Sequence, residues 1–265
     1  MGYIQFEDVH KSFGNNEVLK GITMGVEKGH MATLLGPSGC GKSTLLRCLA
    51  GLEEVTTGKV YVDGKDITDV TPRNRNIGMV FQQYSLFPNM SVYQNVAFGL
   101  NMQKSPKDEV ERKVKEMLKV VGLEEKIDQY PAQLSGGQQQ RVPKVLLLDE
   151  PLSAIDAKLR HSLQIEIRRI QKEFNMTTIF VTHDQDEAMV MSDEIHLFHD
   201  GRIEQSGTPT EMYTAPRTRF AAGFIGSYNI FTAAEFKKLC GEDTDAPDVA
   251  IRPGGVRLNY ETSAP

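Results

Sequence analysis

The chain has 265 residues, of which 40% are hydrophobic and 25% charged, as in ordinary globular proteins. This length suits one large domain with a small appendage, and it supplies enough core to fold without disulfide or metal cross-links. The formal net charge of −5 excludes a global basic field that would recruit nucleic acid or an anionic membrane surface. The three cysteines, an odd number without metal-ligand spacing, favour a reducing cytoplasm.

We expect neither a signal peptide nor a membrane span. The first residues lack a basic flank and an apolar run. The longest apolar stretches, such as Val145 to Leu148, are far shorter than the roughly 20 residues that a membrane helix needs. A role at a membrane would therefore depend on docking onto other subunits.

The first third of the chain predicts short strands and turns around one helix. The helix covers 42–50 and is closed by Gly51. An apolar, buried strand at 31–35 precedes it and runs into a glycine-rich segment. Further strands are expected at 4–6, 13–16, 21–24, 58–64 (with a turn at Asp63-Gly64) and 76–81.

The remainder alternates helices and strands. Apolar residues at helical spacing predict a helical insert within 91–130, namely Val110, Val114, Met117, Leu118 and Val121. Then follow a strand at 145–148, a helix at 157–174, a strand at 177–181, and a hairpin of 194–198 and 202–205 turned by Asp200-Gly201. This order predicts an α/β fold whose mainly parallel sheet is covered by helices. From about Thr232, a short tail of strands and turns resembles the start of a separate β module.

A phosphate-binding loop is predicted between the strand at 31–35 and the helix at 42–50. Glycine-rich loops turn backbone N–H groups toward an anion at a helix N-terminus. Lys42 would neutralise the β- and γ-phosphates of a nucleotide, and the Ser43 hydroxyl would ligate magnesium. The loop comprises Gly36, Pro37, Ser38, Gly39, Cys40, Gly41, Lys42 and Ser43, followed by Thr44.

Two acids end the apolar strand at 145–148. Asp149, at the carboxyl end, is predicted to face the phosphate loop and hold magnesium. Glu150, one residue later, is predicted to orient or deprotonate an attacking water. A strand that ends in acids is by itself more typical of a solvated edge, and the phosphate loop reverses that interpretation.

The segment Leu134-Ser135-Gly136-Gly137-Gln138 resembles the signature of ABC-type ATPases, and the three motifs follow the order of that family. The resemblance implies further roles. Gln82 matches the loop glutamine that contacts magnesium, Asp156 the loop that packs across the dimer, and His183 the histidine that contacts the γ-phosphate. Phe13 lies where the family has an aromatic side chain that stacks on adenine. Three of these residues have plainer alternatives: Gln82 as a surface amide, His183 as a strand-end histidine with its hydrogen bonds satisfied, and Phe13 as a core residue.

The resemblance implies a head-to-tail homodimer that sandwiches two ATP molecules with Mg²⁺. The phosphate loop of one copy would face Ser135, Gly136, Gly137 and Gln138 of the other, so ATP joins the copies and hydrolysis releases them. It also implies an ABC ATPase domain at 1–231, with its helical insert at about 91–142 and an antiparallel N-terminal β subdomain. A short or incomplete oligonucleotide-binding-like regulatory region would follow at 232–265.

Residues 81–92 and 182–188 resemble importers of the maltose, polyamine, sulfate and ferric-ion group, and 224–231 resembles the polyamine members. The resemblance implies permease subunits as direct partners, a solute-binding protein as an indirect one, and a position on the cytoplasmic face of the membrane. Two alternatives are a soluble ABC ATPase acting on DNA or the ribosome and a non-hydrolysing regulatory protein. The single cassette without a basic tail disfavours the first, and Asp149, Glu150 and His183 disfavour the second.

The chain departs from the family after the signature. Where the family has a helix of about three turns, Val142 runs straight into Pro143-Lys144-Val145, so nine or ten residues are expected to be missing. That shortfall corresponds to roughly 14 Å of helix. Pro143 also disfavours helical continuation at Val142.

Overall fold

The computed structural model describes residues 2–75, 77–80, 90–102, 106–120, 124–129, 147–153, 155, 157–173, 175–226 and 228–251. An antiparallel sheet at the N-terminus has the order β2-β1-β4-β5. Its strands are β1 (Ile4–Phe13), β2 (Asn16–Val26), β4 (Thr57–Val62) and β5 (Lys65–Asp66). The antiparallel N-terminal subdomain is confirmed.

The prediction of three short strands before residue 26 was wrong, because the region forms two long strands. The segment at 13–16 is the turn between them, where Gly14 has a φ of 59°. The register of β1 against β2 shifts between Phe6 and Val9. This irregularity places Glu7 and Asp8 among the apolar residues and hides the alternation of one continuous strand.

The central sheet has the order β10-β9-β3-β8-β7-β6. Its parallel strands are β3 (Met31–Leu35), β6 (Met79–Val80), β7 (Leu147–Asp149), β8 (Thr178–Thr182) and β9 (Glu194–His199), and β10 (Arg202–Gly207) pairs antiparallel with β9. Every residue of β3 and β8 is buried, as in parallel strands covered on both faces. The mainly parallel sheet is therefore confirmed, and so is the hairpin at its edge.

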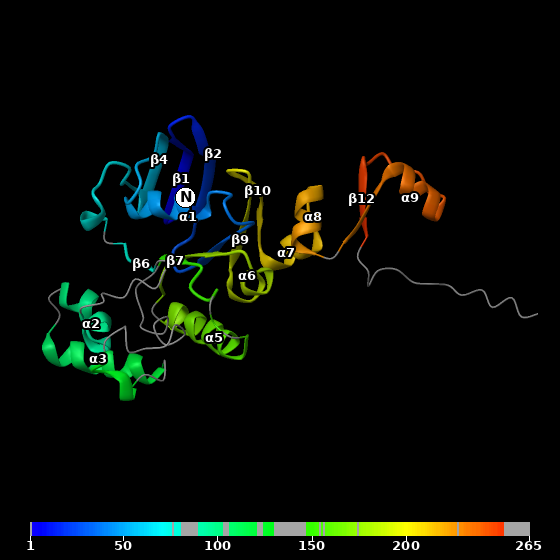
Figure 1. The fold of residues 1–265 in the computed structure, drawn as a ribbon. Coiled ribbons are helices and arrows are strands. Elements are labelled where there is room, and N and C mark those ends of the chain that lie inside the picture. The colour runs from blue at the N-terminus through cyan, green and yellow to red at the C-terminus, as the bar shows by residue number, and fades with distance from the viewer. Residues whose placement is uncertain are drawn as a thin grey trace, which may run out of the picture.

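The main hydrophobic core lies between the two sheets around α1 (Lys42–Ala50), where Leu45, Leu46 and Leu49 are fully buried. A second core on the other face of the central sheet joins Phe180 of β8 to Met191 of α6 (Gln185–Met191). The helix α5 (Ala157–Glu173) packs against it through Leu163 and Ile167. Figure 1 shows α1 on the side of the antiparallel sheet and α5 on the opposite side.

The predicted helical insert contains α2 (Val92–Met102), α3 (Lys107–Val120) and the 3₁₀ turn η2 (Glu124–Lys126), and another 3₁₀ turn, η1 (Pro72–Asn74), precedes β6. Val110, Val114 and Leu118 are buried between the helices, which confirms their helical spacing. The structure does not describe the side chain of Met117 or any part of Val121. Figure 1 shows the two helices as a pair set apart from the antiparallel sheet.

The C-terminal part contains α7 (Pro209–Thr214), α8 (Arg219–Ile225), β11 (Asn229–Thr232), α9 (Ala233–Cys240) and β12 (Asp248–Ile251). The expected β tail is present as the antiparallel pair of β11 and β12. The helix α9 between them was not expected, although Thr232 and Glu235 form a capping box that the sequence displays. No helix within the described ranges is long and apolar enough to cross a membrane.

Candidate functional site

The predicted phosphate loop connects β3 to α1 and needs glycine at two crowded positions. Gly36 has a φ of 154°, and a Cβ there would lie 2.3 Å from the carbonyl oxygen of Phe198. Gly41 has a φ of 104°, and a Cβ would lie 2.9 Å from Cδ2 of Leu19. Gly39, at the exposed tip of the loop, has a φ of 81° and open space around it. Only a chain without side chains at 36 and 41 can follow this path.

Lys42 points back into the loop from the first turn of α1. Its Nζ donates to the carbonyl oxygens of Gly36 and Pro37, both at 2.7 Å, and lies 3.7 Å from Sγ of Cys40. Lys42 is only 4% exposed, and no ion pair among the described residues includes it. A buried ammonium without a carboxylate partner makes a site that favours an anion.

Cys40 is buried in the same loop, and burial raises the pKa of its thiol. The thiol is therefore neutral beside Lys42 and does not offset the charge of the ammonium. Ser38 and Gly39 are exposed, Pro37 is half-buried, and Thr44 lies half-buried on α1. The loop thus presents its tip to solvent and encloses Lys42 at its base.

Ser43 and Asp149 meet across the carboxyl ends of two strands. The Ser43 hydroxyl donates to Oδ1 of Asp149 at 2.6 Å, which joins the start of α1 to the end of β7. Asp149 is 1% exposed, and burial raises the pKa of its carboxyl group, although the hydrogen bond from Ser43 opposes that shift. A hydroxyl and a carboxylate are oxygen ligands of the kind that Mg²⁺ prefers. The residues present therefore fit a magnesium ion, which would keep water ligands, since no cluster of three acidic, His or Cys side chains occurs among the described residues.

Glu150 leaves β7 in a left-handed conformation with a φ of 48°. Its N–H donates to the carbonyl oxygen of Val181 at 3.0 Å, and its own carbonyl accepts from the Ser153 hydroxyl at 3.0 Å. A non-glycine residue in this region is held there by its surroundings, and such strain is concentrated at functional sites. The turn directs the Glu150 side chain away from the side that Asp149 faces.

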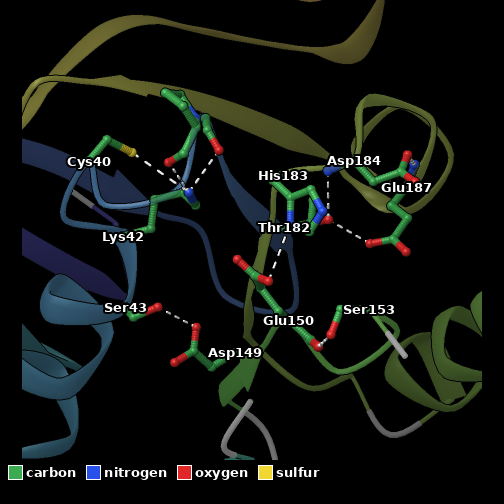
Figure 2. A network of polar contacts seen from close by, with 12 residues as sticks. Cys40, Lys42, Ser43, Asp149, Glu150, Ser153, Thr182, His183, Asp184 and Glu187 are labelled. Atoms are coloured by element: carbon green, nitrogen blue, oxygen red, sulfur yellow. Dashed lines mark hydrogen bonds and ion pairs between the residues drawn. The ribbon is translucent and has the colours of Figure 1, made fainter. Parts of the chain in front are cut away.

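His183 follows β8 and lies opposite Glu150. Its Nδ1 is 3.2 Å from Oε2 of Glu150, and its side chain is 51% exposed, whereas that of Glu150 is 10% exposed. Figure 2 shows Lys42, Ser43 and Asp149 grouped beside the loop, with the Glu150–His183 pair next to them. The structure therefore brings together the loop, the two acids and His183, as the sequence predicts.

A polar network that the sequence analysis missed lies behind His183. The Thr182 hydroxyl donates to Oε2 of Glu187 at 2.6 Å and accepts from the N–H of Asp184 at 3.0 Å. Asp184 caps α6 through the N–H groups of Asp186 and Glu187. Figure 2 shows Thr182 in contact with both Asp184 and Glu187, beside His183. Asp184, two residues after the strand, and the acids Asp186 and Glu187 that follow it were a usable signal, because an N-cap and its first turn have that pattern.

A small cavity of about 40 Å³ adjoins the Glu150–His183 pair, with room for a water molecule. Ser153, Arg160 and Glu187 are among the residues that line it. Burial raises the pKa of the Glu187 carboxyl group, and the hydrogen bond from Thr182 opposes that shift. All the residues that line the cavity have polar or charged side chains.

Phe13 is 48% exposed at the end of β1, and Nζ of Lys11 lies 4.6 Å from the centre of its ring. The core alternative for Phe13 is therefore wrong, and an exposed ring remains available for stacking on a base. The other expected site residues lie outside the described residues: Gln82, Ser135, Gly136, Gly137, Gln138, Asp156 and the junction of Val142 with Pro143.

Comparison with known proteins agrees with this geometry. The sequence profile of the family described as ABC transporter matches residues 19–153. The spermidine/putrescine import ATP-binding protein PotA of Haemophilus influenzae is 49% identical over 89% of this chain and 66% of its own length. PotA of Escherichia coli is 49% identical over 97% of this chain and 70% of its own. The chain thus spans about two thirds of the length of these relatives.

The alignment with the Escherichia coli protein runs over 266 positions yet covers only 97% of the 265 residues here, so roughly nine positions of the relative have no residue opposite them.

Two solved structures share the fold. A dimeric bacterial ABC transporter cassette superposes with a TM-score of 0.71 at 30% identity, over 78% of this chain and 98% of its own. The same cassette in a post-hydrolysis state, bound to ADP and Pi, gives equal values. With the profile match and these relatives, the chain belongs to the ABC transporter family, of which it carries the cassette.

Proposed function

We propose that the chain is the ATP-binding and hydrolysing subunit of an ABC importer whose solute is a polyamine. The observation that supports this most directly is the buried Lys42 ammonium, which lies in a glycine loop at the N-terminus of α1 without a carboxylate partner among the described residues. The positive end of the helix dipole adds to its preference for phosphate. The importer branch rests on the similarity to proteins named for spermidine and putrescine import.

Within this proposal, Ser43 and Asp149 hold Mg²⁺ with oxygen ligands, and Gln82 supplies a third by its resemblance to the family. Magnesium, when bound, neutralises charge on the β- and γ-phosphates. The hydrogen bond from Ser43 occupies Oδ1 of Asp149 and leaves Oδ2 of the carboxylate for the ion. Lys42 exchanges its two carbonyl partners for phosphate oxygens, a charge-assisted contact of greater strength. Phe13 stacks on the adenine.

Glu150 and His183 act on the attacking water and the γ-phosphate. The carboxylate of Glu150 orients the water and accepts its proton as the oxygen attacks phosphorus and the bond to the β-phosphate oxygen breaks. His183 contacts that carboxylate through Nδ1, and in its doubly protonated form its other, half-exposed ring N–H would donate to a phosphate oxygen. Charge stabilisation at these fixed positions lowers the barrier without reorganisation of solvent.

A complete site requires a second copy in this proposal. Ser135, Gly136, Gly137 and Gln138 of one copy close on the phosphate loop of the other, and Asp156 packs at the same interface. Permease subunits in the membrane contact the region of 82–92, which places the protein on the cytoplasmic face. The ATPase domain covers 1–231, and 232–265 is a short regulatory region. Dimeric cassettes among the solved relatives support the assembly.

The test combines the chain with the permease subunits and the solute-binding protein of a polyamine importer in liposomes. ATP hydrolysis that rises when spermidine is supplied, and that Lys42→Ala abolishes, is the expected result. Stimulation by maltose or sulfate components instead would refute the polyamine assignment. ATP binding that does not depend on Lys42 would refute the nucleotide site itself.

A further inference from the structure

Arg160 lies in the first turn of α5 and contacts the segments that follow both β7 and β8. Its Nη2 donates to the carbonyl oxygen of Ile155 at 2.9 Å, and its Nη1 donates to Oδ2 of Asp184 at 3.4 Å. Its Nε lies 3.8 Å from Oε1 of Glu187. The three donor groups of one planar guanidinium thus face three acceptors from two segments, Ile155 after β7 and the pair Asp184 and Glu187 after β8.

On one side, these contacts hold the residues adjacent to His183. Asp184 follows His183 directly, and Glu187 accepts the hydroxyl of Thr182, which precedes it. The N–H of Asp184 in turn donates to that hydroxyl. Because both neighbours of His183 in the chain are fixed by groups that Arg160 contacts, the guanidinium constrains the backbone from which the imidazole projects.

On the other side, the Ile155 carbonyl belongs to the turn that begins at Glu150. Ser153 bonds to the Glu150 carbonyl through its hydroxyl, and the N–H of Ile155 donates to the carbonyl of Leu152 at 3.1 Å. Ile155 is itself buried against the core on the α5 face. Arg160 therefore ties the turn that carries Glu150 to the turn that carries His183.

Because Glu187 is buried, its contact with Arg160 matters more to the local structure than an ion pair on the surface would. Glu187 is 3% exposed, so its carboxylate depends on Thr182 and on the Arg160 charge in place of water. The side chain of Arg160 is 29% exposed, and its Nε is buried without a hydrogen-bond partner among the described residues. A group held so close to an acid, without a full hydrogen bond, responds to small movements of either turn.

We propose that Arg160 is a positioning residue for hydrolysis, which sets the orientation of His183 toward Glu150 by joining their two turns. This inference rests on the proposed function, since it assigns a role within the same ATPase site. The proposed function assigns the nucleotide and magnesium to other residues. Replacing Arg160 is therefore expected to lower kcat and to leave nucleotide binding unchanged.

The experiment uses the full chain with Arg160→Met, Arg160→Lys and the control Arg168→Met. Arg168 lies on the same helix and pairs with Asp193, far along α5 from His183. Its removal breaks an ion pair of similar burial without contact to either turn. For each variant we would measure kcat and KM for ATP, the Kd for ATP and the melting temperature. We would also record the imidazole ¹⁵N NMR signals of His183, which are identified by their absence in His183→Gln.

We expect Arg160→Met to lower kcat at least tenfold with an unchanged Kd, and to shift or broaden the His183 signals in the nucleotide-free chain. Arg160→Lys should recover only part of kcat, because one ammonium cannot reach all three acceptors. Arg168→Met should lower the melting temperature alone. Unchanged His183 signals in Arg160→Met, or an equal loss of kcat in Arg168→Met, would overturn the inference. If neither the chain nor a form with a helical segment inserted after Val142 hydrolyses ATP, the proposed function fails, and the His183 signals still decide the role of Arg160.

Discussion

Nδ1 of His183 lies 3.2 Å from Oε2 of Glu150, so the side chains that follow two neighbouring parallel strands face each other. The pair is asymmetric, because the Glu150 side chain is 10% exposed and that of His183 is 51% exposed. This asymmetry suits a buried carboxylate that handles a proton and an imidazole that reaches outward to a phosphate. The first two predictions concern the two members of this pair.

Replacing Glu150 by Gln should preserve ATP binding and nearly abolish turnover, because the amide keeps the shape of the side chain but does not accept a proton. The variant should accumulate as an ATP-bound dimer. Phosphate release and light scattering in the presence of ATP measure both effects. Glu173→Gln, at an exposed ion pair on α5, serves as the matched control and should retain activity. Ordinary turnover by Glu150→Gln would show that another group is the base.

Replacing His183 by Ala should lower kcat by one to two orders of magnitude, as expected for loss of one preorganised contact to a developing charge. The double variant with Glu150→Gln should lose little more than Glu150→Gln alone, because the two side chains act as a unit. Single-turnover rates for the four members of this cycle measure the coupling. Fully additive losses would mean that the contact seen between the two side chains has no part in catalysis.

Replacing Lys42 by Ala should weaken ATP binding tenfold or more, since charge-assisted hydrogen bonds contribute about 1.5–3 kcal/mol. Titration calorimetry of the Glu150→Gln form measures the affinity without hydrolysis. Lys59→Ala, which removes an exposed ion pair with Asp66 on the antiparallel sheet, should leave it unchanged. Equal affinities for the Lys42 variant and the wild type would exclude the loop as the phosphate site.

We expect His196 to make the free energy of unfolding depend on pH, independently of catalysis. It is 2% exposed on β9 with Nδ1 2.7 Å from the Ser206 hydroxyl, and burial lowers the pKa of its imidazole to about 4. In the unfolded chain the His196 imidazole binds a proton near pH 6.5, whereas in the folded chain it does so only near pH 4. The contribution of His196 to the free energy of unfolding is therefore fully present above about pH 6.5 and is lost as the pH falls toward 4. The loss contributed by this residue is about 3 kcal/mol.

Urea unfolding between pH 7 and pH 4.5 measures this effect as the difference between the wild type and His196→Asn, which cancels the contribution of other groups. We expect the difference to shrink as the pH falls. A difference that is independent of pH would mean that His196 titrates normally in the folded chain.

Inserting a ten-residue helical segment between Val142 and Pro143 should increase ATP-dependent dimerisation and turnover. Eleven residues lie between Gly137 and Asp149 in the sequence, and the last two of them belong to β7. At about 3.3 Å per extended residue, the remainder is too short for both a helix and a return path to the sheet. An insert of ten Gly and Ser residues is the control, since it restores length without a helix. Equal dimerisation by the unmodified chain and the helical variant would contradict this prediction.

The phosphate loop could be predicted from local sequence because its chemistry depends on adjacent residues. Gly36, Gly41 and Lys42 are close in the chain, and the helix that follows fixes their geometry. The apolar β3 and the helical spacing of Val110, Val114 and Leu118 were likewise local patterns. The position of Glu150 directly after β7 could also be predicted, since the order of motifs resembles a known family.

The sequence by itself determined that the chain binds a phosphate group and belongs to the α/β class, since both follow from residues near one another. Only the tertiary structure decided that Ser43 bonds to Asp149, that Glu150 turns toward His183, and that Arg160 joins their two turns. These contacts come from the order of β3, β8 and β7 in the central sheet, which brings distant segments to one edge. Strand order depends on the packing of the whole core, and no local pattern of residues encodes it.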